Sequence, residues 1–331
     1  MDAVLLIPAA VDQSQLLPEQ LRSVPSGVLA ALEEVTDPRR RRGVRHRCAA
    51  VLAIAVCAVL AGARSYLGIA EWAGDLTPVV RRGLGLGRRA PCESTIRRVL
   101  QRIDPDELDR AVCGWLAAQP SAPTPAGRSQ RRLLAVDGKS VRGARLRSLP
   151  DDRAVHLLSA FVTVTGTVLA QTVVDGKTNE ISAFGPLLDR IELTEVLVTA
   201  DALHTQRGHV AYLSPRGAHW LLTVKGNQPK LRAQLRALPW EQVPIADHTS
   251  NKGHGRVEIR SVKLTAISAG IAFPGARLAL QVTRRRRPTG ARRFRTETVY
   301  AITDLTIEQT TAAELAQALR GHWGIENRLH C

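Results

Sequence analysis

The order of apolar segments after residue 131 constrains the fold of this chain more than any other feature of its sequence. Three segments of β-type composition come first, and a helical segment, a buried-type strand, a second helical segment and another strand follow. Their bounds are 133–138, 155–164, 167–175, 179–191, 195–201, 207–215 and 219–227. The Thr165-Gly166 turn predicts that the first three form an antiparallel meander. Strands mixed with helices in this order predict an α/β protein with one mixed sheet.

The remainder of the chain divides into a helical part and a second β-rich part. Residues 1–118 are helical in pattern, and residues 119–130 (QPSAPTPAGRSQ) are rich in Pro, Ser, Ala and Gly and lack periodicity. We therefore predict a helical N-terminal domain over 1–118, a linker over 119–130 and a second domain over 131–331. Within the second domain, three β-type segments predict an antiparallel sheet inserted at about 240–305. They cover residues 256–267, 276–287 and 293–305.

Charge points to a polyanionic partner. Lys and Arg number 46 against 30 Asp and Glu, which gives a net charge of +16. Such a chain binds nucleic acid through phosphate contacts and counterion release, although a basic but merely solvated surface is the alternative. The Ala-rich run 48–63 is shorter than the roughly 20 residues that span a bilayer, so we expect a buried helix and no membrane partner. The five scattered cysteines and the lack of a basic N-terminal region predict a cytoplasmic protein.

Three acidic residues lie at the ends of different apolar segments. They are Asp137 in LLAVDG, Asp201 in VLVTAD and Glu326 in the last helical segment, 312–330. Two strand-borne aspartates and one helix-borne glutamate are the hard oxygen ligands that suit two Mg²⁺ or Mn²⁺ ions, the arrangement used in phosphodiester chemistry. Each residue has a simpler interpretation. Asp137 could belong to an Asp-Gly hairpin turn, Asp201 could cap a strand end, and Glu326 could be a solvated helical residue.

The sequence also contains a decoy for the first of these residues. Val174-Asp175-Gly176-Lys177 nearly repeats the tetrapeptide around Asp137, and spacing alone does not separate the two. Asp137 follows the first strand of the predicted sheet, which favours it over Asp175.

Several polar residues near predicted strand ends are candidates for DNA contact. Lys225, Asn227 and Gln228 in VKGNQ follow a strand, with a Gly-Asn turn and a solvated lysine as the alternative. His254 and Arg256 in HGR are expected to begin the inserted sheet. Either a phosphate contact or a plain β-turn would explain them.

A second candidate for DNA contact lies in the helical part. The segment ESTIRRVLQRI is similar to a recognition helix, with Ser94 as its cap and Arg97 and Arg98 projecting from it. Helix-turn-helix patterns in single sequences are often false, so this remains a hypothesis.

Motifs along the whole chain resemble one family. VDGKSVRG, VDGKTNEI, TADALHTQ, VKGNQ, HGR and RGHWGIENRLH follow DPRRRRGVRH, AVCAVLAGARS, IAEWA and ESTIRRVLQRID. In this order they resemble the ISAs-type insertion-sequence transposases, also called H-repeat-associated proteins. The resemblance implies a DDE transposase with a ribonuclease-H-like core and a short helical N-terminal domain. It maps the acidic triad onto Asp137, Asp201 and Glu326, selects Asp137 over Asp175, and implies a homo-oligomer that binds terminal-repeat and target DNA at the nucleoid.

The chain departs from this family at its end. Family members continue past the LHW that follows the catalytic glutamate, whereas this sequence ends RLHC. We therefore expect a C-terminally truncated chain. The leading hypothesis is a Mg²⁺-dependent transposase that cleaves and joins DNA at insertion-sequence ends. The alternatives are a catalytically dead DNA-binding remnant and a host nuclease without strand transfer.

Overall fold

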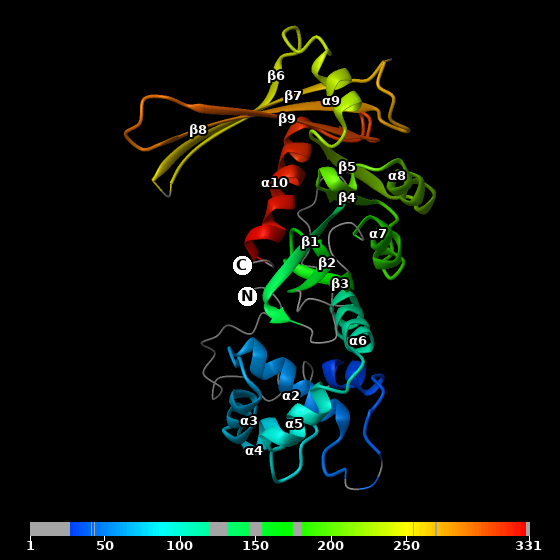
Figure 1. The fold of residues 1–331 in the computed structure, drawn as a ribbon, viewed down its shortest axis with the longest axis vertical. Coiled ribbons are helices and arrows are strands. Elements are labelled where there is room, and N and C mark those ends of the chain that lie inside the picture. The colour runs from blue at the N-terminus through cyan, green and yellow to red at the C-terminus, as the bar shows by residue number, and fades with distance from the viewer. Residues whose placement is uncertain are drawn as a thin grey trace. The chain divides into compact units, whose positions relative to one another are not determined.

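The computed structural model describes residues 27–40, 42, 44–118, 131–145, 154–174, 180–253, 255–268 and 270–328. The chain divides into two compact units (Figure 1). One unit comprises Met1–Pro123 with Thr167–Ala170, and the other comprises Thr124–Gly166 with Gln171–Cys331. Each unit is described by itself.

The first unit is built from helices. A short helix over residues 27–33 is followed by α2 (Cys48–Leu60), α3 (Tyr66–Gly74), α4 (Pro78–Gly83), α5 (Glu93–Leu100) and α6 (Pro105–Ala118). Nine residues of α2 are buried, which confirms the expected buried helix. A helix that is apolar on every side lies at the centre of a core rather than at its edge. No helix in the described part of the chain has both the length and the apolar character needed to cross a bilayer.

The second unit is organised by one mixed sheet, which confirms the predicted α/β class. Its nine strands lie in the order β3-β2-β1-β4-β5-β9-β8-β7-β6. The first five in chain order are β1 (Arg132–Arg145), β2 (Ala154–Val162), β3 (Thr167–Val174), β4 (Val196–Ala200) and β5 (His219–Val224). β1 pairs with β2 antiparallel, whereas β1, β4 and β5 are parallel. This is the strand order and connectivity of a ribonuclease-H-like fold.

The β-rich segment differs from its prediction in two respects. It has four strands rather than three: β6 (Ile245–Gly253), β7 (Arg256–Ala266), β8 (Leu278–Pro288) and β9 (Arg295–Thr303). β6 forms the edge of the sheet and is mostly exposed, so its sequence IADHTSNKG lacks the apolar alternation that identifies a half-buried strand. The segment is also not a separate sheet, because β9 pairs antiparallel with β5 and extends the central sheet.

Four helices accompany this sheet. They are α7 (Glu180–Leu188), α8 (Arg207–Leu213), α9 (Pro229–Arg236) and α10 (Ala312–Arg328). α10 packs on β1 and β4, and Figure 1 shows it in red beside the long strand β1. Its buried side chains include Leu315, Ala318, His322 and Ile325, at the spacing of one helix face. A buried apolar stripe thus fixes which side of α10 faces the strands.

The packing of α2 gives a stability prediction with an internal control. Ile54 is completely buried, whereas Val59 in the same helix is 46% exposed. Ile54→Ala should lower the free energy of unfolding by about 2–5 kcal/mol, because it removes buried methyl groups and leaves a cavity. Val59→Ala should cost less than about 0.5 kcal/mol. Chemical denaturation followed by circular dichroism measures both, and equal losses would contradict the assignment of α2 to the core.

Candidate active site

Two of the three predicted acidic residues lie at the same level of neighbouring strands. β1 and β4 are paired in parallel from Arg132 opposite Val196 to Val136 opposite Ala200. The next residue of each strand is an aspartate, Asp137 and Asp201. Adjacent strands are about 4.8 Å apart, so the two aspartate backbones lie side by side. Both residues are half-buried, which leaves them open to solvent at this edge.

Asp201 also has a capping role, although it caps the start of a short helix and not the strand end that the simpler interpretation predicted. All five residues of β4 are buried, and the chain then turns into the short 3-10 helix η3 (Ala202–His204). The Leu203 N–H donates a hydrogen bond of 2.8 Å to Asp201 Oδ1. A carboxylate offers about four lone-pair sites on two oxygens. The cap therefore orients the carboxylate without using all of its capacity for ligands.

Asp137 does not lie in a hairpin turn, so that alternative was wrong. It also does not end its strand, because β1 continues to Arg145 and Asp137 is paired opposite Ser159 of β2. What ends at this level is the pairing with β4. Asp137 is thus paired with β2 on one side of β1, and on the other side it lies just beyond the last residue paired with β4. Its decoy, Asp175, lies outside the described residues.

Gly138, the next residue, is explained by space rather than by a turn. Its φ is not in the left-handed region. A Cβ atom built on Gly138 would lie only 2.4 Å from Cδ of Glu180. Real Cβ atoms do not approach a carboxylate this closely, so any side chain at position 138 would displace Glu180.

Glu180 belongs to a buried polar cluster that sequence reasoning missed. It is the first residue of α7 and is 4% exposed. Its Oε1 lies 2.6 Å from Nε2 of His156, and its Oε2 lies 3.3 Å from Nε2 of His204. Nδ1 of His156 is 2.9 Å from Oγ of Ser140. The cluster therefore joins β1, β2, α7 and η3.

The charge state of this cluster follows from its contacts. Burial raises the pKa of Glu180, whereas hydrogen bonding and charge from the His204 and His156 rings lower it. The lowering is the larger effect, so the pKa of Glu180 lies below its usual range. Glu180 is then an acceptor at neutral pH, and the Nε2–H of His156 donates to it. The only sequence signal was the presence of Glu180 and His204 inside the motifs VDGKTNEI and TADALHTQ.

The third acidic residue, Glu326, lies on α10, and its side chain is outside the described part of the structure. Leu315 and Ala318 share an apolar cluster with Leu197 of β4. One turn later, Nδ1 of His322 lies 3.3 Å from Oγ1 of Thr199, two residues before Asp201. α10 therefore advances along β4 toward its carboxyl end. Glu326 follows His322 by four residues, about one helical turn.

Two of the residues predicted to contact DNA have structural partners. β5 ends at Val224, and the side-chain amide of Asn227 donates to the Ala202 carbonyl. The amide of Gln228 donates to the Thr205 carbonyl at 2.8 Å. Both bonds hold the segment that follows Asp201, a role that the sequence did not reveal. Lys225 is exposed.

The HGR motif lies at a hairpin rather than at the start of the inserted sheet. Arg256 is the first residue of β7 and pairs with Gly253 at the end of β6. Gly255 has a φ of 68°, as the tight connection requires. Arg256 is exposed, and His254 lies outside the described residues. The motif therefore lies in a turn, and this position leaves the side chain of Arg256 exposed.

The arginines of α5 project as expected. Arg97 and Arg98 are exposed, whereas Ile96 and Val99 are buried. The N-cap is Cys92, and Ser94 lies within the first turn, which corrects the predicted cap. The helix begins earlier because Glu93 can occupy its first turn, where a negative charge is favourable.

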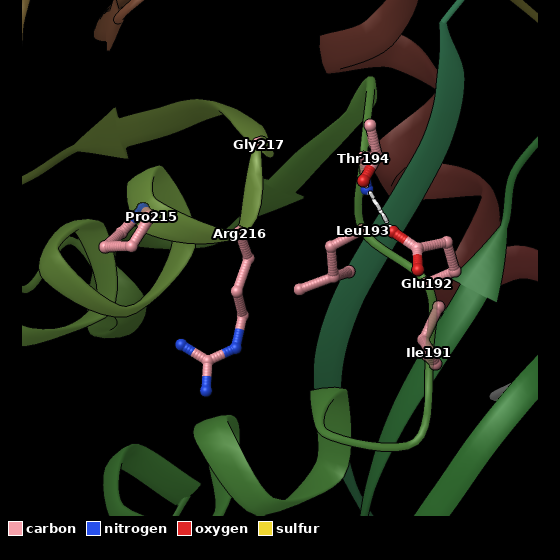
Figure 2. A pocket seen from close by; sticks show the side chains of 7 residues that line it. All are labelled: Ile191, Glu192, Leu193, Thr194, Pro215, Arg216 and Gly217. Carbon is pink, nitrogen blue, oxygen red and sulfur yellow. Dashed lines mark hydrogen bonds between the residues drawn. The ribbon is translucent and has the colours of Figure 1, made fainter.

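A pocket elsewhere in the second unit does not coincide with this site. Figure 2 shows its lining, which comes from the loop before β4 and the loop before β5. The lining residues are Ile191, Glu192, Leu193, Thr194, Pro215, Arg216 and Gly217. These loops precede the strands, whereas Asp137 and Asp201 lie at the opposite, carboxyl end. Arg216 is also engaged, with its guanidinium 3.8 Å from the ring centre of Tyr212.

A ribonuclease-H-like sheet with two aspartates directly after the last paired residues of β1 and β4 indicates a nucleic-acid enzyme, and comparison with known families specifies its class. The family model described as "Transposase DDE domain" matches residues 128–331, and the one described as "DDE_Tnp_1-associated" matches residues 29–116. The chain belongs to the DDE transposase family, and it is similar to H-repeat-associated proteins.

Relatives are similar over most of their length. The "Putative transposase YncI" of Escherichia coli O157:H7 is 27% identical over 92% of this chain and 78% of its own. The "H repeat-associated putative transposase YhhI" of Escherichia coli K12 is 28% identical over 89% of this chain and 79% of its own. The "Uncharacterized protein in dhlA 3'region" of Xanthobacter autotrophicus is 31% identical over 78% of this chain and 88% of its own. A solved piggyBac transposase synaptic complex with hairpin DNA aligns with a TM-score of 0.39, 9% identity and coverage of 94% and 66%, too distant to support an inference.

The start of α5 gives a prediction about thiol reactivity. Hydrogen bonds from Ser94 and Thr95 lower the pKa of the exposed Cys92 thiol to about 7, whereas burial raises the pKa of Cys48 and of Cys57 to about 11. Cys92 therefore has a larger thiolate fraction at pH 7 than Cys48 or Cys57. Iodoacetamide should modify it at least about ten-fold faster than the other two, because the thiolate is the nucleophile.

Peptide mass spectrometry measures this order. Ser94→Ala removes the largest cause of the lowered pKa, so it should slow the modification of Cys92 at pH 7 and have less effect at pH 9. Equal rates for the three cysteines would contradict the prediction.

Proposed function

We propose that this protein is a metal-dependent DNA transposase that cleaves DNA and joins strands at insertion-sequence ends, with Asp137, Asp201 and Glu326 as its metal ligands. The observation that carries the proposal is the register of β1 and β4, in which Asp137 and Asp201 are the next residues after the last paired positions. Family membership supplies the class of reaction.

The donor set fits hard divalent cations. Two carboxylates at one sheet edge are the oxygen ligands that Mg²⁺ and Mn²⁺ prefer. No three described His, Cys, Asp or Glu side chains gather into a metal site by themselves, so the proposal assigns the third ligand to Glu326. Two such ions, when bound, activate the attacking oxygen and stabilise the leaving oxygen in phosphodiester cleavage.

The protein's own groups hold the aspartates in place. The backbone N–H of Leu203 orients Asp201, and the amides of Asn227 and Gln228 fix the turn behind it. β2 holds Asp137 through its pairing with Ser159. Since both amide groups are engaged within the fold, we assign the phosphate contact in VKGNQ to the exposed Lys225.

DNA binding is assigned to basic groups of both units. We propose that Arg97 and Arg98 of α5 contact terminal-repeat DNA and that His254 and Arg256 contact phosphates. Joining requires that two DNA ends be held together, which favours a homo-oligomer assembled on DNA. A protein with chromosomal DNA as its substrate would act in the cytoplasm, at the nucleoid.

Removal of one strand aspartate tests the catalytic assignment. Asp137→Ala and Asp201→Ala should each lower the rate of cleavage of terminal-repeat DNA about a thousand-fold or more, because residues that act as one unit fail together. Asp175→Ala, the same change in the near-identical tetrapeptide, is the control and should retain activity. DNA affinity should stay within about two-fold in all three variants, because none removes a basic group.

Cleavage that survives Asp137→Ala would exclude this triad. A wild-type chain that binds the same DNA without cleaving it would favour the catalytically dead remnant.

The role of α5 is tested by a charge-matched pair of variants. Arg97→Ala with Arg98→Ala should weaken terminal-repeat binding in a gel shift and reduce the slope of affinity against salt by about two phosphate contacts. Arg232→Ala with Arg236→Ala removes the same charge from exposed positions of α9 and should have a smaller effect. Equal effects of the two pairs would mean that α5 contributes only general positive charge.

A further inference from the structure

The buried cluster of Glu180, His156 and His204 lies on the segments that carry both aspartates. The Glu180 carboxylate packs against Gly138, the residue after Asp137. His204 ends η3, the short helix that Asp201 caps. One side chain therefore contacts the backbone of β1 next to Asp137 and the imidazole of His204, which lies on the short helix that Asp201 caps.

Stability alone does not account for such a cluster. A buried carboxylate with two imidazoles must give up its hydration, and replacing such groups with apolar ones of similar volume is often neutral or stabilising. Buried polar groups of this kind do fix one arrangement of their neighbours, because each partner must be met in a specific geometry. The geometry that this cluster fixes is the separation between β1 and η3.

Contacts reach Glu180 from both sides of this separation, through hydrogen bonds on the β1 side and through a longer contact on the η3 side. On the β1 side, Ser140 is bonded to His156, and His156 to Glu180. On the η3 side, Nε2 of His204 faces the other oxygen of Glu180 at 3.3 Å. His209 supports this side, since its Nδ1 lies 3.0 Å from the His204 carbonyl.

The absence of a side chain at Gly138 allows the carboxylate of Glu180 to lie directly against the β1 backbone. A Cβ at this position would approach both carboxylate oxygens of Glu180 to 2.5 and 2.6 Å. The backbone of Gly138 and the carboxylate of Glu180 are thus in direct contact, and no side chain lies between them that could adjust if either one moved. A shift of Glu180 would be transmitted to the residue next to Asp137.

We infer that Glu180, held by His156 and His204, is a positioning residue that sets the spacing of Asp137 and Asp201 for the metal ions. The inference rests on the proposed function. We assign Glu180 no metal contact, because it is 4% exposed and each of its oxygens faces an imidazole. Its removal should weaken metal binding while leaving DNA binding intact.

The test compares Glu180→Gln with Glu241→Gln, an exposed glutamate in the same unit. Mn²⁺ binding to the full chain is followed by electron paramagnetic resonance, and the Mg²⁺ concentration for half-maximal cleavage is measured in parallel. Glu180→Gln should weaken Mn²⁺ binding about ten-fold and raise the Mg²⁺ requirement by a similar factor, as for groups that orient metal ligands. Glu241→Gln should match the wild type in both measurements.

A coupling experiment distinguishes positioning from general support of the core. Gly138→Ala should impair metal binding as Glu180→Ala does, because its Cβ displaces the carboxylate. If the two act through the same contact, the double variant should be no worse than Glu180→Ala alone. Additive losses would overturn the inference. Ser140→Ala, at an exposed position, keeps the test decisive if the buried variants fail to fold, and it should raise the Mg²⁺ requirement about three-fold.

Asp137→Ala separates this inference from the proposed function. If Asp137→Ala retains both Mn²⁺ binding and cleavage, the proposed function is wrong. If Asp137→Ala loses both, while Glu180→Gln and Ser140→Ala keep the wild-type metal requirement, only the positioning role is wrong.

Discussion

The parallel pairing of β1 with β4 is the interaction on which the candidate site depends. It brings Asp137 and Asp201 to one level, although two carboxylates of like charge on neighbouring strands repel each other. The opposing force comes from the strands below, where Leu134 and Val198 are paired and fully buried. A sheet can hold like charges together because its register is set by the apolar residues and backbone hydrogen bonds of the same strands. The repulsion between the two aspartates is thus locally unfavourable, and the packing and pairing of the buried strand residues offset it.

Around this pair, the polar residues serve the geometry of the site more than the stability of the core. The turn after Asp201 is held by Asn227 and Gln228 and by Thr205, whose hydroxyl donates to the Thr223 carbonyl at 2.6 Å. β5 and the turn that follows it therefore support the segment that comes directly after β4. Asn227, Gln228 and Thr205, which appear in the sequence as surface polar residues, hold this turn through hydrogen bonds. This explains how VKGNQ can be important at the site whether or not its amides contact DNA.

The fold was largely predictable, and the candidate site only in part. The order of strands and helices followed from periodicity, because β4 and β5 are apolar runs bounded by polar turns. β6 was missed because an exposed edge strand has no buried face to leave a pattern. The Glu180 cluster was missed for a different reason: its members come from four elements, and only tertiary folding shows that Glu180 fills the space opposite Gly138. The roles of the triad and the domain boundaries stay predictions.

The inserted antiparallel strands help to determine where the last acidic residue lies. β9 pairs with β5 as far as Thr303 opposite Leu221. Asp304 then accepts hydrogen bonds from the Trp220 N–H at 2.8 Å and from His219 Nδ1 at 2.9 Å. A reciprocal pair between Thr311 and Glu314 starts α10 a few residues later. The start of α10 is therefore anchored to β5, and its buried stripe directs it along β4. The position of Glu326 thus depends on a strand that enters the sheet only after the β-rich excursion, so this segment is part of the framework of the site.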